Sequence, residues 1–142
     1  MLTVSSGMGI RMKPVVCAQT RIDKAHYQTS TTIDGHTVIS DEPPEKGGAD
    51  TGVNPHGLLL AGLGSCTAIT LRMYIDRKMW LVDEIAVNLE LFKTEDGYLI
   101  EMQVSFQGEL NDDQRKRLIQ IADACPIHKM LTGNINITTA LR

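Results

Sequence analysis

The stretch Gly57-Leu-Leu-Leu-Ala-Gly-Leu-Gly-Ser-Cys-Thr-Ala-Ile-Thr-Leu71 is fifteen residues long and contains no charged side chain. Pro55 and His56 precede it, and Arg72 follows it. A membrane-spanning helix needs about 20 apolar residues, so this run predicts a helix buried in a soluble core instead. Cys66 lies near the middle of the run, and its thiol is the feature of the chain that most needs an explanation.

The run predicts a helix that starts at Pro55 and continues to about Met79. Proline suits the first helical position because its φ is fixed and it has no N–H to leave unpaired. Beyond Leu71 the charged residues fall on the outer side of the helix. Gly62 and Gly64 weaken a helix unless another backbone packs closely against them. Four residues recur at helical spacing and mark one helix face: Leu59, Leu63, Cys66 and Thr70.

Length and charge limit the classes of function. We expect residues 1–13 to be a flexible N-terminal segment and residues 14–142 to form a single domain that needs no disulfide framework. A net charge of −3 and a pI near 5.7 argue against nucleic acid as a partner, because such proteins need a basic footprint. The cluster Arg115-Lys116-Arg117 is interpreted as the solvated face of a helix.

The cysteine content points to a reducing compartment. Cys17, Cys66 and Cys125 form no Cys-x-x-Cys pair and are too few for a secreted disulfide scaffold. Free or redox-active thiols are the better interpretation. The N-terminus has no apolar signal region and no small-residue cleavage site, so we expect a cytoplasmic protein with no membrane partner.

The N-terminal half is predicted to begin as a β-meander. Strands are expected at 15–22, 26–33 and 36–40, the last two joined by the turn Asp34-Gly35. A loop rich in proline and glycine follows at 41–54. Long loops in compact domains are often functional.

The C-terminal half alternates between strand and helix patterns. Alternating apolar residues predict an antiparallel pair at 82–93 and 98–108, and a capping-box pattern starts a helix at 111–124. A short helical turn at 127–131 leads to a closing strand at 135–141. The resulting order, βββ-α-ββ-α-β, predicts an α+β fold of antiparallel sheets and segregated helices. Because few strands cover the long apolar helix, we expect a second copy of the chain to supply part of the core in a homodimer.

The cysteines allow more than one interpretation. Cys66 is either a small core residue or a thiolate activated by nearby positive charge or hydrogen-bond donors. Candidate donors are Ser65, Thr67 and Thr70, although hydroxyls on buried helices usually bond to their own backbone. Cys125 precedes a proline that ends a helix, and such a position presents the thiol to a cleft. Zinc is a further alternative, with Cys125 and His128 as two ligands. Cys66 and His56 would complete that site. Cys17, in a predicted strand, is interpreted as a packed apolar residue.

Several motifs give nearly the whole chain beyond about Pro14 a resemblance to a known family. The central segment, Pro55-His-Gly-Leu-Leu-Leu-Ala-Gly-Leu-Gly-Ser-Cys-Thr-Ala-Ile-Thr-Leu-Arg-Met-Tyr74, is preceded by Asp41-Glu-Pro43 and Gly47-Gly48. It is followed by Cys125-Pro-Ile-His128. Together these segments resemble the OsmC/Ohr family, the osmotically inducible protein C and organic hydroperoxide resistance group.

The resemblance implies a cysteine-based peroxidase that acts on organic hydroperoxides and on hydrogen peroxide. Its fold would be an intertwined α+β homodimer, with antiparallel sheets wrapped around long central helices and an active site at the subunit interface. Cys66 matches the peroxidatic cysteine, which would become a sulfenic acid. Cys125 matches the resolving cysteine, which would form a disulfide with it, and a thiol or dithiol reductant would restore both thiols. No metal, haem or flavin cofactor is implied.

The chain departs from the family in the groups that stabilise the thiolate. Family peroxidases use an arginine from the N-terminal strands, and Arg21 is the nearest candidate, with Lys24 as an alternative. A glutamate that holds this arginine would fall at His56 or Gly57, where the carboxylate is absent. Glu42 and Glu45 are candidate substitutes from the loop, and His56 is a candidate donor to the thiolate. The rival hypothesis is therefore a redox-sensing or ligand-binding dimer with the same fold and little turnover.

Overall fold

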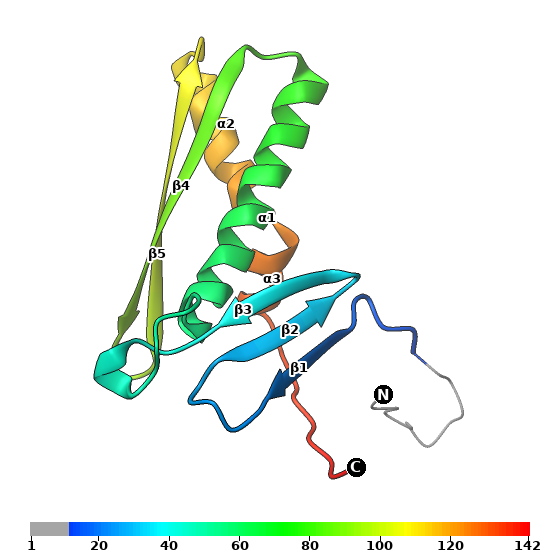
Figure 1. Cartoon of the computed structure of the whole chain (residues 1–142). Helices are drawn as coiled ribbons and strands as arrows, with labels where there is room; N and C mark the ends of the chain where they lie inside the picture. The colour runs from blue at the N-terminus through cyan, green and yellow to red at the C-terminus, as the bar shows by residue number, and fades with distance from the viewer. Residues whose placement is uncertain (1–11) are drawn as a thin grey trace. The chain divides into compact units, whose positions relative to one another are not determined.

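The computed structural model describes residues 12–142, which form two compact units. One unit comprises the chain up to Pro55 together with Ile137–Arg142, and the other comprises His56–Asn136. The predicted flexible segment at 1–13 lies almost entirely outside the described residues. Mixed helices and antiparallel sheets confirm the predicted α+β class (Figure 1).

The N-terminal unit contains a three-stranded antiparallel meander. Its strands are β1 (Ala18–Ile22), β2 (Thr29–Ile33) and β3 (His36–Ser40), in the sheet order β1-β2-β3. Asp34 and Gly35 turn β2 into β3, and both have positive φ, at 48° and 81°, as a type I′ hairpin turn requires. β1 and β2 each start three residues later than predicted, because the pairing begins only at Ala18 opposite Ile33 and ends at Ile22 opposite Thr29.

The loop after β3 is held together by buried polar groups. Ser40 Oγ donates to the carbonyl of Val53 at 2.6 Å, and the Asp41 carboxylate accepts hydrogen bonds from the hydroxyl and amide of Thr51. The Thr51 hydroxyl, with further backbone amides, lowers the pKa of Asp41 although its burial acts in the opposite direction. Gly48 packs so closely that an added Cβ would lie 1.9 Å from the carbonyl oxygen of Glu42. The loop, with its 3-10 turn η1 (Pro44–Lys46), is therefore a built structure.

The second unit contains the long helix and a β-hairpin. α1 (Pro55–Lys78) begins at the predicted proline, and β4 (Val82–Lys93) and β5 (Tyr98–Gly108) match the predicted strands. α2 (Asp112–Ala122) starts with the predicted capping box of Asn111 and Gln114, and α3 (Pro126–Thr132) follows. Arg115, Lys116 and Arg117 are exposed on α2, which confirms the solvated helix face.

The core of this unit forms where α1 and α2 meet the hairpin. Five buried residues make its centre: Leu71, Ile75, Val82, Leu118 and Ala122. The buried stripe of α1 differs from the predicted face, since it follows Leu63, Thr67, Leu71 and Ile75, whereas Leu59 is exposed. The prediction at Leu59 was wrong, because the buried stripe of α1 starts one turn later, at Leu63.

Two further sequence predictions were wrong. Residues 135–141 form no strand, and Ile135, Ile137 and Leu141 are exposed. An alternating pattern becomes a strand only when another edge pairs with it, and neither sheet of the described chain pairs with this segment. Cys17 is exposed instead of packed, because it lies just before β1, whose residues are all exposed.

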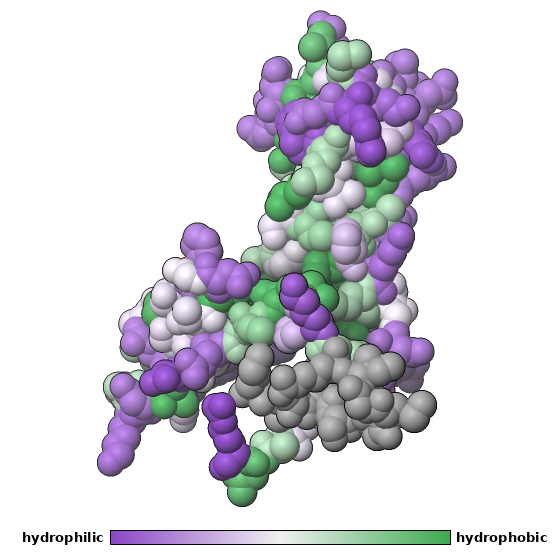
Figure 2. Space-filling model, turned by 90° about the vertical axis from the view of Figure 1, so that its right-hand side faces the viewer, coloured by the Kyte–Doolittle hydropathy of each residue, from purple (hydrophilic) through white to green (hydrophobic). Residues whose placement is uncertain are grey.

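α1 leaves much of its surface uncovered within the chain. By length and composition this helix is long and apolar enough to cross a membrane, although the uncharged run within it is shorter. Core helices of soluble proteins meet the same criterion. Only 22% of its most apolar window is buried. Figure 2 views the molecule from the side on which α1 lies in Figure 1 and shows hydrophobic residues at the surface.

Candidate functional site

Cys66 is carried on the side of α1 next to the buried stripe. Thr67, the next residue, is fully buried, and its hydroxyl donates to the Met102 sulfur on β5 at 3.7 Å. Gly64 lets the helix approach the hairpin closely, since an added Cβ would lie 2.8 Å from a methyl carbon of Leu89. These contacts fix the rotation of α1 and leave Cys66 half-buried.

Cys125 lies between α2 and α3. It is the N-cap residue of α3, with ψ of 133°, an extended geometry that the following Pro126 favours. Its side chain has no solvent exposure. The backbone amides of Ile127 and His128 lie within hydrogen-bonding reach of its sulfur. The proline thus ends one helix, starts another and holds the thiol at the junction.

The fold brings the two cysteines together. Cys66 and Cys125 are 59 residues apart in the sequence, yet their thiols lie close enough to interact, and no disulfide joins them. Thr67 and Thr70 add hydroxyl groups next to this pair, Thr67 toward Cys125 and Thr70 toward Cys66. A pair of neighbouring thiols with donors around it can give up two electrons reversibly by forming a disulfide.

The electrostatics of the pair are unequal. Burial raises the pKa of the Cys66 thiol, and the hydrogen bond with Cys125 raises it further. Burial also opposes ionisation of Cys125, but the hydrogen bond from Cys66 and the amide of His128 outweigh it and lower the pKa of Cys125. Burial therefore opposes ionisation of Cys66, whose thiolate a nearby positive group would stabilise.

The predicted activating groups other than His56 belong to the N-terminal unit, whereas both cysteines belong to the second unit. Arg21 lies on β1 and Lys24 follows it, both are exposed, and Arg21 donates to Gln19 at 3.5 Å. Neither Glu42 nor Glu45 forms an ion pair within residues 12–142. His56 is exposed in the first turn of α1.

The structure does not support the zinc alternative, because no group of three or more His, Cys, Asp or Glu side chains comes together among the described residues. His128 instead approaches Asp123, with 3.9 Å between its Nδ1 and the carboxylate.

The sequence identified Thr67 as a candidate donor to Cys66, whereas in the structure its hydroxyl lies toward Met102 and Cys125. Met102 was not identified, since it was visible only as one apolar residue in an alternating strand. The helical stripe offered a signal for Thr67, because it lies four residues after Leu63 and four before Leu71. No local pattern could show that β5 places Met102 against it.

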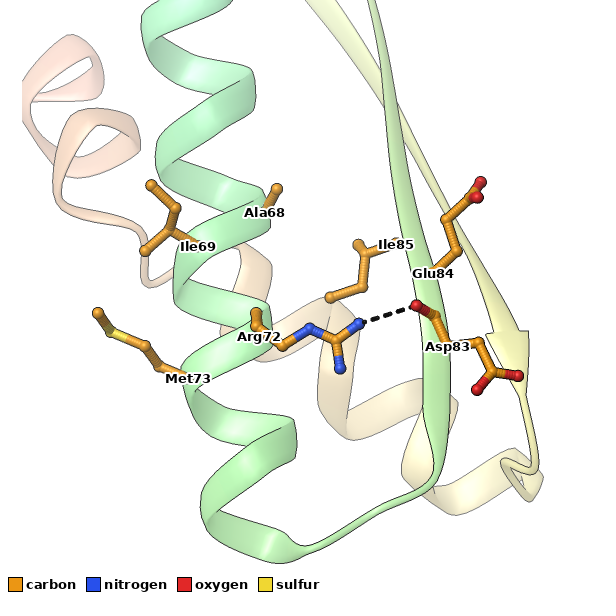
Figure 3. Close-up of a pocket in the computed structure, with 7 residues that line it drawn as sticks. All are labelled: Ala68, Ile69, Arg72, Met73, Asp83, Glu84 and Ile85. Atoms are coloured by element: carbon orange, nitrogen blue, oxygen red, sulfur yellow. Dashed lines mark hydrogen bonds between the residues drawn. The ribbon is translucent and has the colours of Figure 1, made fainter.

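An open groove lies on another side of α1, between this helix and β4. It has a volume of about 500 Å³, and Arg72 crosses it to donate to the carbonyls of Val82 at 2.9 Å and Asp83 at 3.5 Å (Figure 3). Ile69 and Met73 project from the far side of the helix in this view and are 55% and 66% exposed. Neither cysteine lines the groove, so it is not the thiol site.

In this α+β unit, α1 carries Cys66, and the junction of α2 and α3 carries Cys125 next to it. The fold and the site therefore belong to the class of proteins with a paired-thiol site. Residues 47–140 match the family model described as OsmC-like protein, and the chain belongs to this family. This confirms the family that the sequence motifs indicated.

Solved structures agree with this fold. An OsmC-like protein from Mycoplasma pneumoniae is 20% identical, with a TM-score of 0.73 over 86% of this chain and 90% of that chain. An organic hydroperoxide resistance protein OsmC from Legionella pneumophila is 25% identical, with a TM-score of 0.62 over 85% and 91%. One from Elizabethkingia anophelis is 20% identical, with a TM-score of 0.63 over 88% and 93%. A comparison with curated proteins finds no match.

Proposed function

We propose that the protein is a thiol peroxidase that reduces organic hydroperoxides, and hydrogen peroxide as a second substrate. The observation that supports this most is the contact between the thiols of Cys66 and Cys125. Some structural neighbours are organic hydroperoxide resistance proteins, which agrees with this substrate class. A cytoplasmic location fits the need to keep both thiols reduced between turnovers.

The proposed reaction uses the two cysteines in sequence. The Cys66 thiolate attacks the distal oxygen of the hydroperoxide, the O–O bond breaks, and the alkoxide leaves as an alcohol after taking a proton. The Cys66 sulfenic acid is then attacked by the Cys125 thiolate, an S–S bond forms and hydroxide leaves as water. A dithiol reductant supplies two electrons by exchange and restores both thiols. The greater exposure of Cys66 supports its role as the first nucleophile.

Because the pKa of Cys66 is raised, we infer that a positive side chain stabilises its thiolate, and Arg21 is our candidate. Changing Arg21 to alanine should lower kcat/KM for cumene hydroperoxide by about 10- to 100-fold and move the pH profile upward, because less Cys66 is ionised. Changing Lys24 to alanine is the matched control and should have little effect. The measurement is dithiol-dependent hydroperoxide consumption across pH, and an unchanged profile in the Arg21 variant would remove Arg21 from the site.

A redox-sensing dimer is the second candidate function, and the same raised pKa of Cys66 favours it, together with the missing carboxylate at His56 or Gly57. The two functions differ in turnover. Wild-type protein that consumes only one equivalent of hydroperoxide, even with excess dithiol, would support the sensor over the peroxidase.

We also propose that the protein is a homodimer in which the exposed face of α1 meets a second copy. Ile69 and Met73 expose apolar side chains there, and an added Cβ at Gly62 would meet no atom within 4 Å, which leaves space for a partner helix. A second copy would also supply an edge for residues 135–141.

Changing Ile69 to aspartate should raise the dimer dissociation constant on the order of 100-fold, because the partner would bury an unpaired charge. Sedimentation velocity over a concentration series measures this. The Ile119 to aspartate variant makes the same chemical change at an exposed position of α2 and should leave the constant unchanged. Equal sedimentation of wild type and the Ile69 variant would contradict an interface on this face.

A further inference from the structure

The buried hydroxyl of Thr67 is the one polar side chain of α1 with no solvent exposure. It follows Cys66 directly but points elsewhere, into the space between Cys125 and the hairpin. Two sulfur atoms are within its reach, the Met102 thioether at 3.7 Å and the Cys125 thiol. The rest of the buried stripe on α1 is made of apolar side chains and Gly64, so a hydroxyl here costs desolvation that packing does not explain.

A threonine hydroxyl has a single proton and donates one hydrogen bond at a time. A thioether is a weak acceptor, whereas a thiolate accepts a charge-assisted bond that is about twice as strong as a neutral one. The Thr67 proton should therefore turn toward Cys125 when that sulfur is ionised. It should turn toward Met102 when Cys125 is protonated or bonded in a disulfide.

We propose that Thr67 is a positioning residue for the second half of the cycle, where its hydroxyl holds Cys125 as the attacking thiolate and Met102 serves as the resting acceptor for the same proton. This inference rests on the proposed two-cysteine cycle. In the step it assists, the Cys125 thiolate attacks the sulfur of the Cys66 sulfenic acid, the S–O bond breaks and hydroxide leaves as water. Thr67 forms and breaks no covalent bond.

Few other groups face Cys125 from the elements around it. Cys66 faces it from α1, and the amides of Ile127 and His128 face it from α3. The His128 side chain is directed toward Asp123, at 3.9 Å. Among the described residues, Thr67 is thus the side chain other than the partner cysteine that stabilises this sulfur, which makes its removal an interpretable experiment.

Removing the donor at Thr67 and removing the acceptor at Met102 should change the rate of disulfide formation in opposite directions. Changing Thr67 to valine keeps the shape of the side chain but removes the donor. Disulfide formation after a peroxide pulse should become about tenfold slower, while sulfenic acid forms at Cys66 at the wild-type rate. Changing Met102 to leucine removes the competing acceptor and should make disulfide formation faster than in wild type. Changing Thr67 to serine keeps the hydroxyl and should preserve the rate, even if the lost methyl lowers stability.

A second readout needs no peroxidase activity. In protein with Cys17 and Cys66 both changed to serine, Cys125 is the only thiol, and thiolate absorbance against pH reports its ionisation. The Thr67 to valine change should move this titration to higher pH, and the Met102 to leucine change should move it to lower pH. A role in packing alone would not produce opposite signs.

The outcomes separate this inference from the proposed function. If wild type forms a sulfenic acid and then a disulfide, but the valine variant matches it in rate and in the Cys125 titration, Thr67 has no positioning role and the peroxidase stands. If wild type forms no sulfenic acid, the proposed cycle fails, and the Cys125 titration still decides whether Thr67 stabilises the thiolate. If the valine variant does not fold, the Met102 to leucine variant decides, and a Cys125 titration that does not move to lower pH would overturn the inference.

Discussion

Replacing Cys66 with serine should abolish hydroperoxide consumption, with a loss of at least about 1,000-fold in kcat/KM. A serine hydroxyl is almost fully protonated at neutral pH and forms no sulfenic acid, so the first step of the cycle has no nucleophile. The measurement is dithiol-dependent loss of cumene hydroperoxide, compared with hydrogen peroxide. The exposed Cys17 provides the matched control, and its serine variant should keep wild-type turnover.

The Cys125 to serine variant should behave differently from the Cys66 variant. It should still reduce one equivalent of hydroperoxide, because Cys66 remains, but it should accumulate sulfenic or overoxidised Cys66 that a sulfenic acid probe labels. If the Cys66 variant turns over as fast as wild type, the reaction does not use this thiol. If only the Cys125 variant is inactive in the first step, the roles of the two cysteines are reversed, as the lower pKa of Cys125 would allow.

Replacing Leu71 with alanine should cause the largest loss of stability among single truncations on α1. Leu71 has no solvent exposure and lies at the centre of the cluster formed with Ile75 and Leu118. Removing three carbon atoms there loses burial and leaves a cavity, which costs about 2–5 kcal/mol. Urea unfolding followed by Trp80 fluorescence measures the change, since this is the single tryptophan of the chain.

Leu81 provides the matched control for this experiment. It is 69% exposed in the turn between α1 and β4, so its change to alanine should cost less than about 0.5 kcal/mol. Equal losses at Leu71 and Leu81 would contradict the position of the core between α1, α2 and the hairpin.

The elements that could be predicted from the sequence are those whose signals are local. Pro55 marked the helix start, Asp34-Gly35 the hairpin turn, and the alternation in Val82–Lys93 and Tyr98–Gly108 both long strands. Each signal depends on backbone geometry or on burial of one face, and both are visible within a few residues. The three N-terminal strands were found in the right order for the same reason.

Features that depend on a distant partner could not be predicted in this way. Residues 135–141 alternate like a strand, but no edge within the described chain receives them. Leu59 has the spacing of a buried residue and is exposed, because the buried stripe of α1 starts only at Leu63. The contact of Cys66 with Cys125 was expected only from the family resemblance, and the place of Met102 was not expected at all.

The sequence left two interpretations of Cys66, a core residue or a reactive thiol. Its contact with Cys125 favours the reactive thiol, and an experiment can test its reactivity. The most direct measurement is to treat fully reduced protein with one equivalent of cumene hydroperoxide and to map the disulfides by peptide mass spectrometry. We expect one disulfide between Cys66 and Cys125 of the same chain, with two thiols lost for each hydroperoxide reduced and Cys17 still free. Unmodified Cys66 and Cys125 with the hydroperoxide intact would contradict it.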